Sequence, residues 1–211
     1  MLGDLLMSWP TNVTALREPH EIERMHFLDS LSLLDLPAVR AASSIVDIGS
    51  GAGLPALVLA LALPGTRVVA LESQRKKCEF IREAVSRMGL GNVVVECARA
   101  EDYGRSPQRG SFDIAVSRAL ASLAVSAELS LPLLRLGGAM VAMKGAISNE
   151  ERTLGARALA ILGADSLELV RLDPFPDAEN RWACLAVKTR DTAATFPRRP
   201  GMPAKKPLGS G

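Results

Sequence analysis

Aromatic residues and cysteines are scarce in this chain, and each shortage argues against a class of structure. Aromatic residues make up only 4% of the 211 residues, so leucine, valine and alanine must fill the core. The three cysteines, Cys78, Cys97 and Cys184, lie far apart and form no CxxC pair. This spacing argues against a disulfide scaffold or a zinc site, and we expect no bound metal.

Long apolar runs are also missing. The longest, Leu54 to Pro64, is shorter than the roughly 20 residues that span a bilayer. The opening residues, MLGDLLMSWPTN, have no basic segment and carry Asp4, so they do not resemble a signal peptide. Together these absences predict a cytoplasmic protein with no membrane partner.

Neither sign of charge dominates, since the formal net charge is +2. Binding to nucleic acid would therefore depend on local basic patches and not on overall charge. Hydrophobic residues make up 48% of the chain, which is enough for a sizeable core. The length indicates one domain with small additions.

Strand-like and helix-like segments alternate along the central part of the chain. Near-continuous Val, Ile and Ala runs are typical of strands that are buried on both faces of a parallel sheet. The alternation predicts an α/β fold with helices on both faces of the sheet, closed by an antiparallel pair of strands. The expected strands cover residues 44–49, 67–72, 92–97, 112–117, 138–145, 166–172 and 182–189. One expected helix begins at about residue 55, and others cover 74–88, about 120–134 with an interruption or restart near Pro132, and 149–162.

The two ends of the chain differ from this pattern. Apolar residues recur at helical spacing in EIERMHFLDSLSLLDL, so residues 1–40 are expected to form a helical segment that ends at Pro37. Residues 41–191 then form the main domain. Residues 192–211 form a basic, proline-rich tail.

A glycine-rich loop follows the first expected strand. Gly49, Gly51 and Gly53 let the backbone turn sharply and let a ligand approach the main chain. The dinucleotide fingerprint GxGxxG would require glycine where Leu54 stands. Asp47 would repel a pyrophosphate but suits a ligand with an ammonium or sulfonium group. The loop therefore favours S-adenosylmethionine over NAD, with a purely structural tight turn as the alternative.

Two further segments lie at the carboxyl ends of neighbouring strands, where ligands bind in an open sheet. Glu72 ends the second strand and could accept hydrogen bonds from both ribose hydroxyls. The segment ARAED follows the third strand and would border the adenine, with Glu101 or Asp102 beside it. The alternative in both places is an ordinary solvated acid.

The fourth strand leads into SRALASL, which carries neither a (D/N)PP(Y/F/W) tetrapeptide nor a cysteine nucleophile. Ser117 and Arg118 occupy the position instead, so the site offers no evident base or nucleophile. This suits an acceptor that is nucleophilic without losing a proton, such as guanine N7. Catalysis would then depend on positioning, with Arg118 and Lys144 as candidates and no acid–base residue.

Several stretches resemble the RsmG (GidB) family of small-subunit ribosomal RNA guanine-N7 methyltransferases. They are NVTAL, HFLDSL, VDIGSGAGLP, FDIAVSRALASL, AMKG and FPRRPGMPAKKPL, and they extend from about Trp9 to Leu208. The resemblance implies a class I S-adenosylmethionine-dependent methyltransferase with a Rossmann-like fold. Its sheet would have seven mostly parallel strands and an antiparallel last strand. The implied substrate is 16S ribosomal RNA or the small ribosomal subunit.

The same resemblance implies roles for individual residues. Gly49, Leu54, Ala100, Glu101 and Arg118 take the family's donor-binding roles by motif match.

The tail and the end of the fifth strand are expected to bind RNA. The tail combines phosphate-binding charge with a stacking ring and could fold back near the mouth of the cleft. Lys144 could meet a phosphate or guanine O6, with a structural salt bridge as the alternative. The expected RNA-binding residues are Lys144, Phe196, Arg198, Arg199, Lys205 and Lys206.

Two other functions remain open from the sequence. The first is a methyltransferase of the same fold that acts on a small molecule or a protein. The second is a non-catalytic ribosome-binding factor. We expect the protein to be a monomer.

Overall fold

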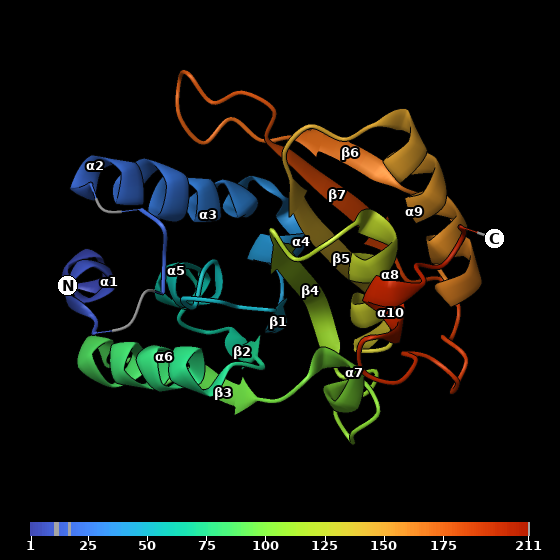
Figure 1. Cartoon of the computed structure of the whole chain (residues 1–211), viewed down its shortest axis with the longest axis horizontal. Helices are drawn as coiled ribbons and strands as arrows, with labels where there is room; N and C mark the ends of the chain where they lie inside the picture. Colours follow the sequence, from blue (N-terminus) through green and yellow to red (C-terminus); the bar gives the residue numbers. More distant parts are fainter. Residues whose placement is uncertain (11–12, 17, 211) are drawn as a thin grey trace.

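Seven strands form one sheet in the computed structural model, which describes residues 1–10, 13–16 and 18–210 (Figure 1). Their order across the sheet is β3-β2-β1-β4-β5-β7-β6. Strands β1 to β5 are parallel, and β7 is antiparallel to both of its neighbours. This confirms the predicted α/β fold with an antiparallel last strand. The strands are β1 (Ser44–Ile48), β2 (Arg67–Glu72), β3 (Val93–Cys97), β4 (Phe112–Arg118), β5 (Leu134–Lys144), β6 (Glu168–Arg171) and β7 (Trp182–Val187).

Helices cover both faces of the sheet, as the sequence predicts. The amino-terminal helices, α5 and α6 lie over one face, whereas α8 and α9 lie over the other (Figure 1). The helical segments are α1 (Leu2–Ser8), α2 (Pro19–Ile22), the π-helical η1 (Glu23–Leu28), α3 (Asp29–Leu31), the 3-10 turn η2 (Ser32–Asp35), α4 (Pro37–Arg40), α5 (Ala56–Ala62), α6 (Arg75–Met88), α7 (Ala100–Tyr103), α8 (Leu123–Ser130), α9 (Asn149–Leu162) and α10 (Met202–Lys205).

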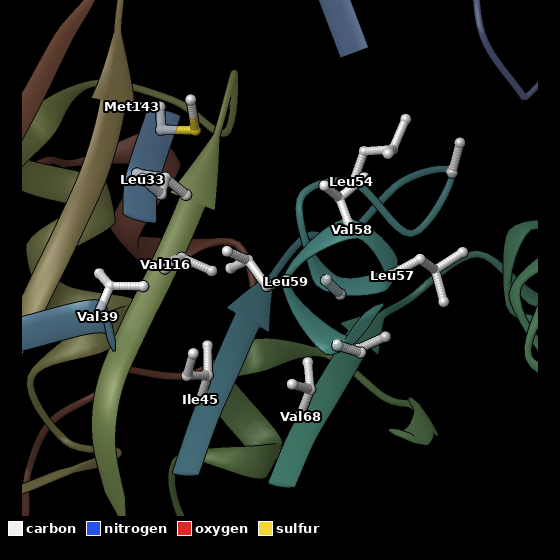
Figure 2. Packing of buried hydrophobic residues seen from close by; sticks show 14 of the residues in the cluster. Leu33, Val39, Ile45, Leu54, Leu57, Val58, Leu59, Val68, Val116 and Met143 are labelled. Atoms are coloured by element: carbon white, nitrogen blue, oxygen red, sulfur yellow. The ribbon is translucent and has the colours of Figure 1, made fainter. Parts of the chain in front are cut away.

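The sheet separates two hydrophobic cores, because successive residues of a strand point to opposite faces. Ile45 of β1 packs into the core under α5, while Val46, the next residue, packs into the core under α8. Figure 2 shows Ile45, Val68 and Val116 with Leu59 of α5 in the first core. This double-sided burial explains the near-continuous apolar runs of the strands.

One predicted boundary is wrong. The helix expected over residues 120–134 ends at Ser130, and β5 already begins at Leu134. Pro132 lacks a backbone N–H and cannot continue the helix, while Leu134 pairs with Phe112 of β4. The pairing register then shifts, from Phe112 opposite Leu134 to Ile114 opposite Ala139, because β5 has extra residues at this point, and β5 continues into its expected part. The leucines around Pro132 resemble a helix face in sequence, and only strand pairing separates them.

The amino-terminal segment is helical but not one regular helix. Residues 19–35 pass through α2, η1, α3 and η2, and α4 starts afresh at Pro37. The described residues include no helix long and apolar enough to cross a membrane. Asn12 of the NVTAL stretch lies outside the described residues. The domain boundaries at residues 40 and 191 stay predictions.

The tail folds back against the main body, as expected. The Arg109 guanidinium donates hydrogen bonds to the carbonyls of Thr192 and Phe196, both at 2.6 Å. Arg105 Nε donates to the Pro197 carbonyl at 2.9 Å. Beyond these contacts the chain forms the short helix α10 beside α8 (Figure 1).

Candidate functional site

The glycine loop between β1 and α5 has a backbone shape that requires glycine. Gly49, Gly51 and Gly53 have φ angles of 69°, 59° and 76°. L-amino acids with a side chain rarely adopt this left-handed region. A Cβ atom on Gly49 would also lie 2.7 Å from Leu120 Cδ1. The sharp backbone turn that the sequence predicts is therefore present, and the approach of a ligand to it stays a prediction.

Asp47 stabilises this loop through hydrogen bonds. The carboxylate is completely buried, and its Oδ2 accepts hydrogen bonds from Ser50 Oγ at 2.7 Å and from the Ala56 N–H at 3.1 Å. Burial raises the pKa of Asp47 to about 6. Oδ1 has no hydrogen-bond partner. A buried, unpartnered carboxylate oxygen is costly, and a cationic group of a ligand at the loop would supply a partner.

Glu72 ties the loop to the neighbouring strand. Its carboxylate accepts hydrogen bonds from the Gly51 N–H at 2.9 Å and from the Gln74 N–H at 2.8 Å. The acid at the end of β2 is thus at the predicted place, with both oxygens bonded to backbone. Its role toward ribose hydroxyls, like the role of Asp47 toward the donor, stays a prediction.

A cavity of about 240 Å³ lies at the carboxyl ends of β1, β2 and β3. Its walls include Gly49, Ala100 and Glu101, three of the residues predicted to bind the donor. Leu54 is buried in the core beside α5. The other walls include Ala98 and Arg99 of the segment ARAED, which the sequence predicts beside the adenine, and residues of strand ends, α8 and the tail that the sequence did not assign to the donor. In full, the other wall residues are Ile48, Leu71, Ser73, Ala98, Arg99, Leu120, Ala121, Val125, Leu129, Gly201, Pro203 and Ala204.

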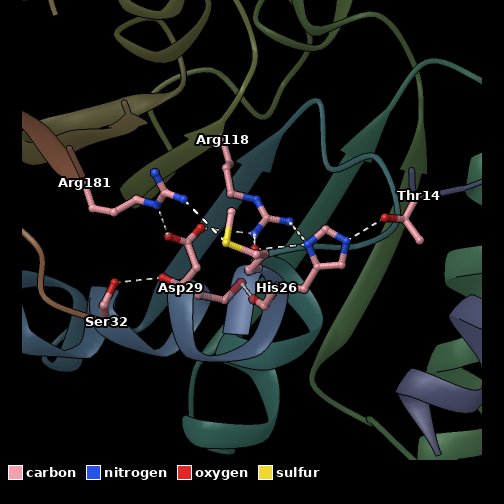
Figure 3. Close-up of polar contacts among 8 residues, drawn as sticks. Thr14, His26, Asp29, Ser32, Arg118 and Arg181 are labelled. Carbon is pink, nitrogen blue, oxygen red and sulfur yellow. Dashed lines mark hydrogen bonds and ion pairs between the residues drawn. The ribbon is translucent and has the colours of Figure 1, made fainter. Parts of the chain in front are cut away.

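Arg118, at the end of β4, is predicted to bind the donor but is not in the wall of this cavity, and its side chain lies in a polar cluster (Figure 3). Its guanidinium donates to the Met25 carbonyl at 3.1 Å and to Asp29 Oδ2 at 3.3 Å. Arg181 pairs with the other oxygen of Asp29 at 3.3 Å. The Asp29 carboxylate thus forms ion pairs with two arginines, with Arg118 through Oδ2 and with Arg181 through Oδ1.

His26 completes the cluster. Its Nε2 lies 2.7 Å from Thr14 Oγ1, and its Nδ1 lies 3.5 Å from Arg118 Nη2 (Figure 3). Burial and the positive charge of Arg118 lower the pKa of His26. The imidazole is therefore neutral at physiological pH. The π-helical η1 carries His26, and such irregular turns often occur at functional sites.

A second cavity, of about 430 Å³, opens beside this cluster. Arg118 and Ala119 line it, whereas the next two residues, Leu120 and Ala121, line the first cavity. The loop between β4 and α8 thus lies between the two cavities. Ala119 has a φ of 51°, an uncommon backbone conformation for alanine that is often found at functional sites. The other walls of the second cavity are Thr14, Ala15, Leu16, Met25, His26, Asp29, Met143, Lys144, Gly145, Leu172, Arg181 and Trp182.

The sequence assigned only Arg118 of this cluster to the site, and the stretch HFLDSL contains two of the residues that it missed, His26 and Asp29. The signal was therefore visible in the sequence, but the contact with Arg118 spans about ninety residues of chain and appears only in the fold. No group of three or more His, Cys, Asp or Glu side chains among the described residues could hold a metal ion.

Lys144 lies at the edge of the second cavity but is not free. Its ammonium pairs with Glu151 at 2.9 Å and donates to the Ala121 carbonyl. A third cavity, of about 480 Å³, has Lys144 and Glu151 in its wall together with Pro207 and Ser210 of the tail. The structural salt bridge that we considered as an alternative is thus present, and the RNA contact of Lys144 stays a prediction.

The five RNA-binding candidates of the tail fall into two groups. The Arg198 guanidinium pairs with the fully buried Glu128, and Phe196 packs half-buried against the core under α8. These two residues anchor the tail. The three exposed candidates are Arg199, Lys205 and Lys206. Only these three present their charge to solvent as a phosphate contact requires.

Comparison with known proteins agrees with this arrangement. The family model "GidB: rRNA small subunit methyltransferase G" matches residues 4–174. A protein of Rubrobacter xylanophilus named ribosomal RNA small subunit methyltransferase G is 43% identical over 204 residues, which cover 95% of this chain and 78% of the relative. The chain belongs to the rRNA small subunit methyltransferase G family.

Further relatives and structures support this assignment and the fold. A protein of the same name from Deinococcus radiodurans is 43% identical over 201 residues, covering 93% of this chain and 78% of the relative. A SAM-dependent methyltransferase from Aquifex aeolicus has the same fold, with a TM-score of 0.61 and 16% identity over 85% of this chain and 98% of its own. Membership of the methyltransferase G family confirms the resemblance seen in the sequence and supports S-adenosylmethionine as the cofactor. The glycine loop, with Gly49 in the wall of the first cavity, fits such a ligand.

Proposed function

We propose that this protein transfers the methyl group of S-adenosylmethionine to N7 of a guanine in 16S ribosomal RNA. The observation that carries the proposal is the loop Arg118–Ala121, which has the donor cavity on one side and a cavity lined by Arg118, Lys144 and Arg181 on the other. A donor and an acceptor base bound in these cavities would meet at this loop. The names of the family and of its relatives support ribosomal RNA as the substrate.

The polar cluster beside the second cavity favours N7 as the acceptor atom. Asp29 is neutralised by two arginines, and the arginine charge keeps His26 from taking up a proton easily. Such a site is poor at removing a proton. Guanine N7 has a lone pair in the ring plane and needs no deprotonation, so holding it in line with the methyl group suffices.

The walls of the second cavity suit a guanine in other ways. Guanine presents two acceptors, N7 and O6, on one edge. If N7 faces the methyl group, O6 is left for a single donor, and the Lys144 ammonium at the cavity edge is of that kind. Trp182 in the same wall offers a surface on which a base can stack. Exposed cations of the tail would contact neighbouring phosphates.

Mass mapping of methylated RNA tests the proposal directly. Purified protein and labelled S-adenosylmethionine are incubated with unmethylated 16S RNA, with small ribosomal subunits, and with a small-molecule and protein extract. We expect one 7-methylguanine in the ribosomal RNA. A methyl group on another base atom, or label only in the extract, contradicts the proposal. Donor binding without any transfer would favour a non-catalytic ribosome-binding factor.

The pH dependence of the chemical step tests the absence of a general base. We expect single-turnover rates at saturating RNA to stay nearly flat from mildly acidic to mildly basic pH, because N7 carries no proton to remove. The comparison of wild type with His26→Gln checks the one imidazole at the site. A rate that follows a side-chain pKa, and loses that dependence in His26→Gln, contradicts the positioning mechanism.

A further inference from the structure

The carboxy-terminal strap, which we define as residues 198–206, supplies three residues to the wall of the donor cavity. Its first anchor is Arg198, whose Nε and Nη2 donate to the two carboxylate oxygens of Glu128 at 2.8 and 2.6 Å. The Arg198 backbone N–H donates to the same carboxylate at 2.8 Å. Glu128 is completely buried, so this anchor is a strong one.

The second anchor lies in the donor cavity itself. The Gly201 N–H donates to Glu101 Oε1 at 2.8 Å, and Glu101 belongs to the segment that we expect beside the adenine. Gly201, Pro203 and Ala204 line the cavity together with Glu101. The strap is therefore a wall of the cavity, placed there by a contact between residues that are a hundred positions apart in the chain.

The outer side of the strap is positively charged and exposed. Arg199, Lys205 and Lys206 are exposed, whereas Pro203 is buried. One short segment thus combines an uncharged inner wall of the donor cavity with three cations that face solvent. A polyanion on the outer side would hold the strap against the cavity.

We propose that Gly201–Ala204 form part of the S-adenosylmethionine site, where they cover the adenosyl group, and that the strap couples donor binding to RNA binding. The coupling is reciprocal by thermodynamic necessity, so RNA tightens donor binding by the factor by which donor tightens RNA binding. The second half of this inference rests on the proposed RNA substrate. The first half concerns the donor alone and does not depend on it.

Two truncations test the wall directly by calorimetry with S-adenosylhomocysteine in the absence of RNA. A chain that ends after Pro200 keeps the Arg198 anchor but loses the wall, and we expect donor affinity to fall about tenfold or more. The matched control ends after Lys206 and keeps the wall, so its affinity should stay within about twofold of the full chain. Equal affinity of the two truncated chains overturns the proposal.

A pair of substitutions covers the case in which the shorter chain does not fold. Both residues are exposed, but only Ala204 lines the cavity, so Ala204→Trp adds a large ring to the cavity wall and Lys205→Trp adds the same ring outside it. We expect Ala204→Trp to weaken S-adenosylhomocysteine binding about tenfold and Lys205→Trp to leave it nearly unchanged, with both variants melting as one folded species. Unchanged affinity of Ala204→Trp overturns the proposal.

The coupling is read from donor affinity with and without 16S RNA. We expect RNA to tighten S-adenosylhomocysteine binding to wild type, and to tighten it less in the triple variant Arg199→Ala, Lys205→Ala, Lys206→Ala at saturating RNA. The triple variant should bind the donor normally when RNA is absent. Equal tightening in both proteins overturns the coupling. Failure of the proposed function would appear separately, as donor binding that depends on the strap without 7-methylguanine in the RNA.

Discussion

At the residue scale, the donor loop depends on a few backbone N–H groups that two buried carboxylates hold in place. Glu72 accepts a hydrogen bond from the Gly51 N–H. Asp47 accepts one from the Ala56 N–H, which is the first free N–H of α5. These bonds fix the loop before any ligand arrives. Pre-formed binding sites of this kind lose less entropy on binding.

Substitution of Gly51 should abolish donor binding. Gly51 has a φ of 59°, and valine disfavours this conformation whatever space surrounds it. We expect Gly51→Val to show no measurable S-adenosylhomocysteine binding by calorimetry. Gly65→Ala is the matched control, because a Cβ there meets no atom within 4 Å. Undiminished binding by Gly51→Val would show that the loop does not hold the donor.

Asp47 lowers the stability of the folded protein at neutral pH. The pKa of its carboxyl rises from 3.8 in the unfolded reference to about 6 in the folded protein. Between these values the folded state binds more protons than the unfolded state, so the contribution of Asp47 is most favourable at acid pH and is lost as pH rises toward 6. Above that pH the buried charge costs roughly 3 kcal/mol.

The isosteric variant Asp47→Asn should therefore be more stable than wild type at neutral pH. Its amide oxygen can still accept from Ser50 and Ala56, while the buried charge is gone. We expect urea unfolding to show a gain near pH 7.5 that shrinks near pH 4, together with weaker donor binding. The same free-energy difference at both pH values would contradict this account.

At the element scale, α8 contributes both to the cavities and to the anchoring of the strap. Its amino-terminal end follows the loop between the two cavities, and its buried Glu128 anchors the strap. The sequence predicts both Arg198 and Arg199 as phosphate contacts. In the structure their roles differ, because the Arg198 guanidinium is bound to Glu128 whereas Arg199 is exposed.

Loss of Arg198 should therefore act on stability. Arg198→Ala leaves Glu128 buried without its partner, and we expect it to lower the free energy of unfolding by about 3 kcal/mol or more. Arg199→Ala, the matched control, should change it by less than about 0.5 kcal/mol. The double variant Arg198→Ala, Glu128→Gln should recover part of the loss in chemical unfolding. Equal effects of the two single variants would contradict the anchoring role.

At the scale of the whole molecule, the near-neutral net charge of +2 means that RNA must be held by a local patch. The strap supplies exposed cations beside the first cavity, and the tail continues from it to the third cavity, whose wall includes Lys144. Lys144 also lines the second cavity, which is the one proposed for the acceptor base.

The salt dependence of RNA binding tests this patch. We expect Arg199→Ala with Lys205→Ala to weaken 16S RNA binding and to reduce the log–log salt slope by about two units, one for each phosphate that the protein no longer neutralises. The matched control removes two exposed cations of α6, with Lys76→Ala and Arg82→Ala. Identical slopes for the two double variants would leave the strap without a specific role in RNA binding.

Much of this protein could be predicted from local sequence. The order of strands and helices follows from alternating apolar segments. The sharp loop follows from the spacing of Gly49, Gly51 and Gly53, because a backbone of this shape requires glycine. Local rules were less reliable where the backbone competes for partners at long range. Residues 131–134 resemble a helix in sequence, and only the pairing of β5 with β4 shows otherwise. The hydrogen bonds that Glu72 accepts from Gly51 and Gln74 likewise appear only in the fold.

Short stretches of sequence are therefore enough to establish the fold class, the donor loop and the family, because periodicity, glycine spacing and motifs are local properties. The role of each charge depends instead on the folded molecule. Folding placed Arg118 between His26 and Asp29, bound Arg198 to Glu128, and brought Gly201 to Glu101. A charged side chain has a role that depends on its partner and its burial. Both are set by segments distant in sequence that packing brings together.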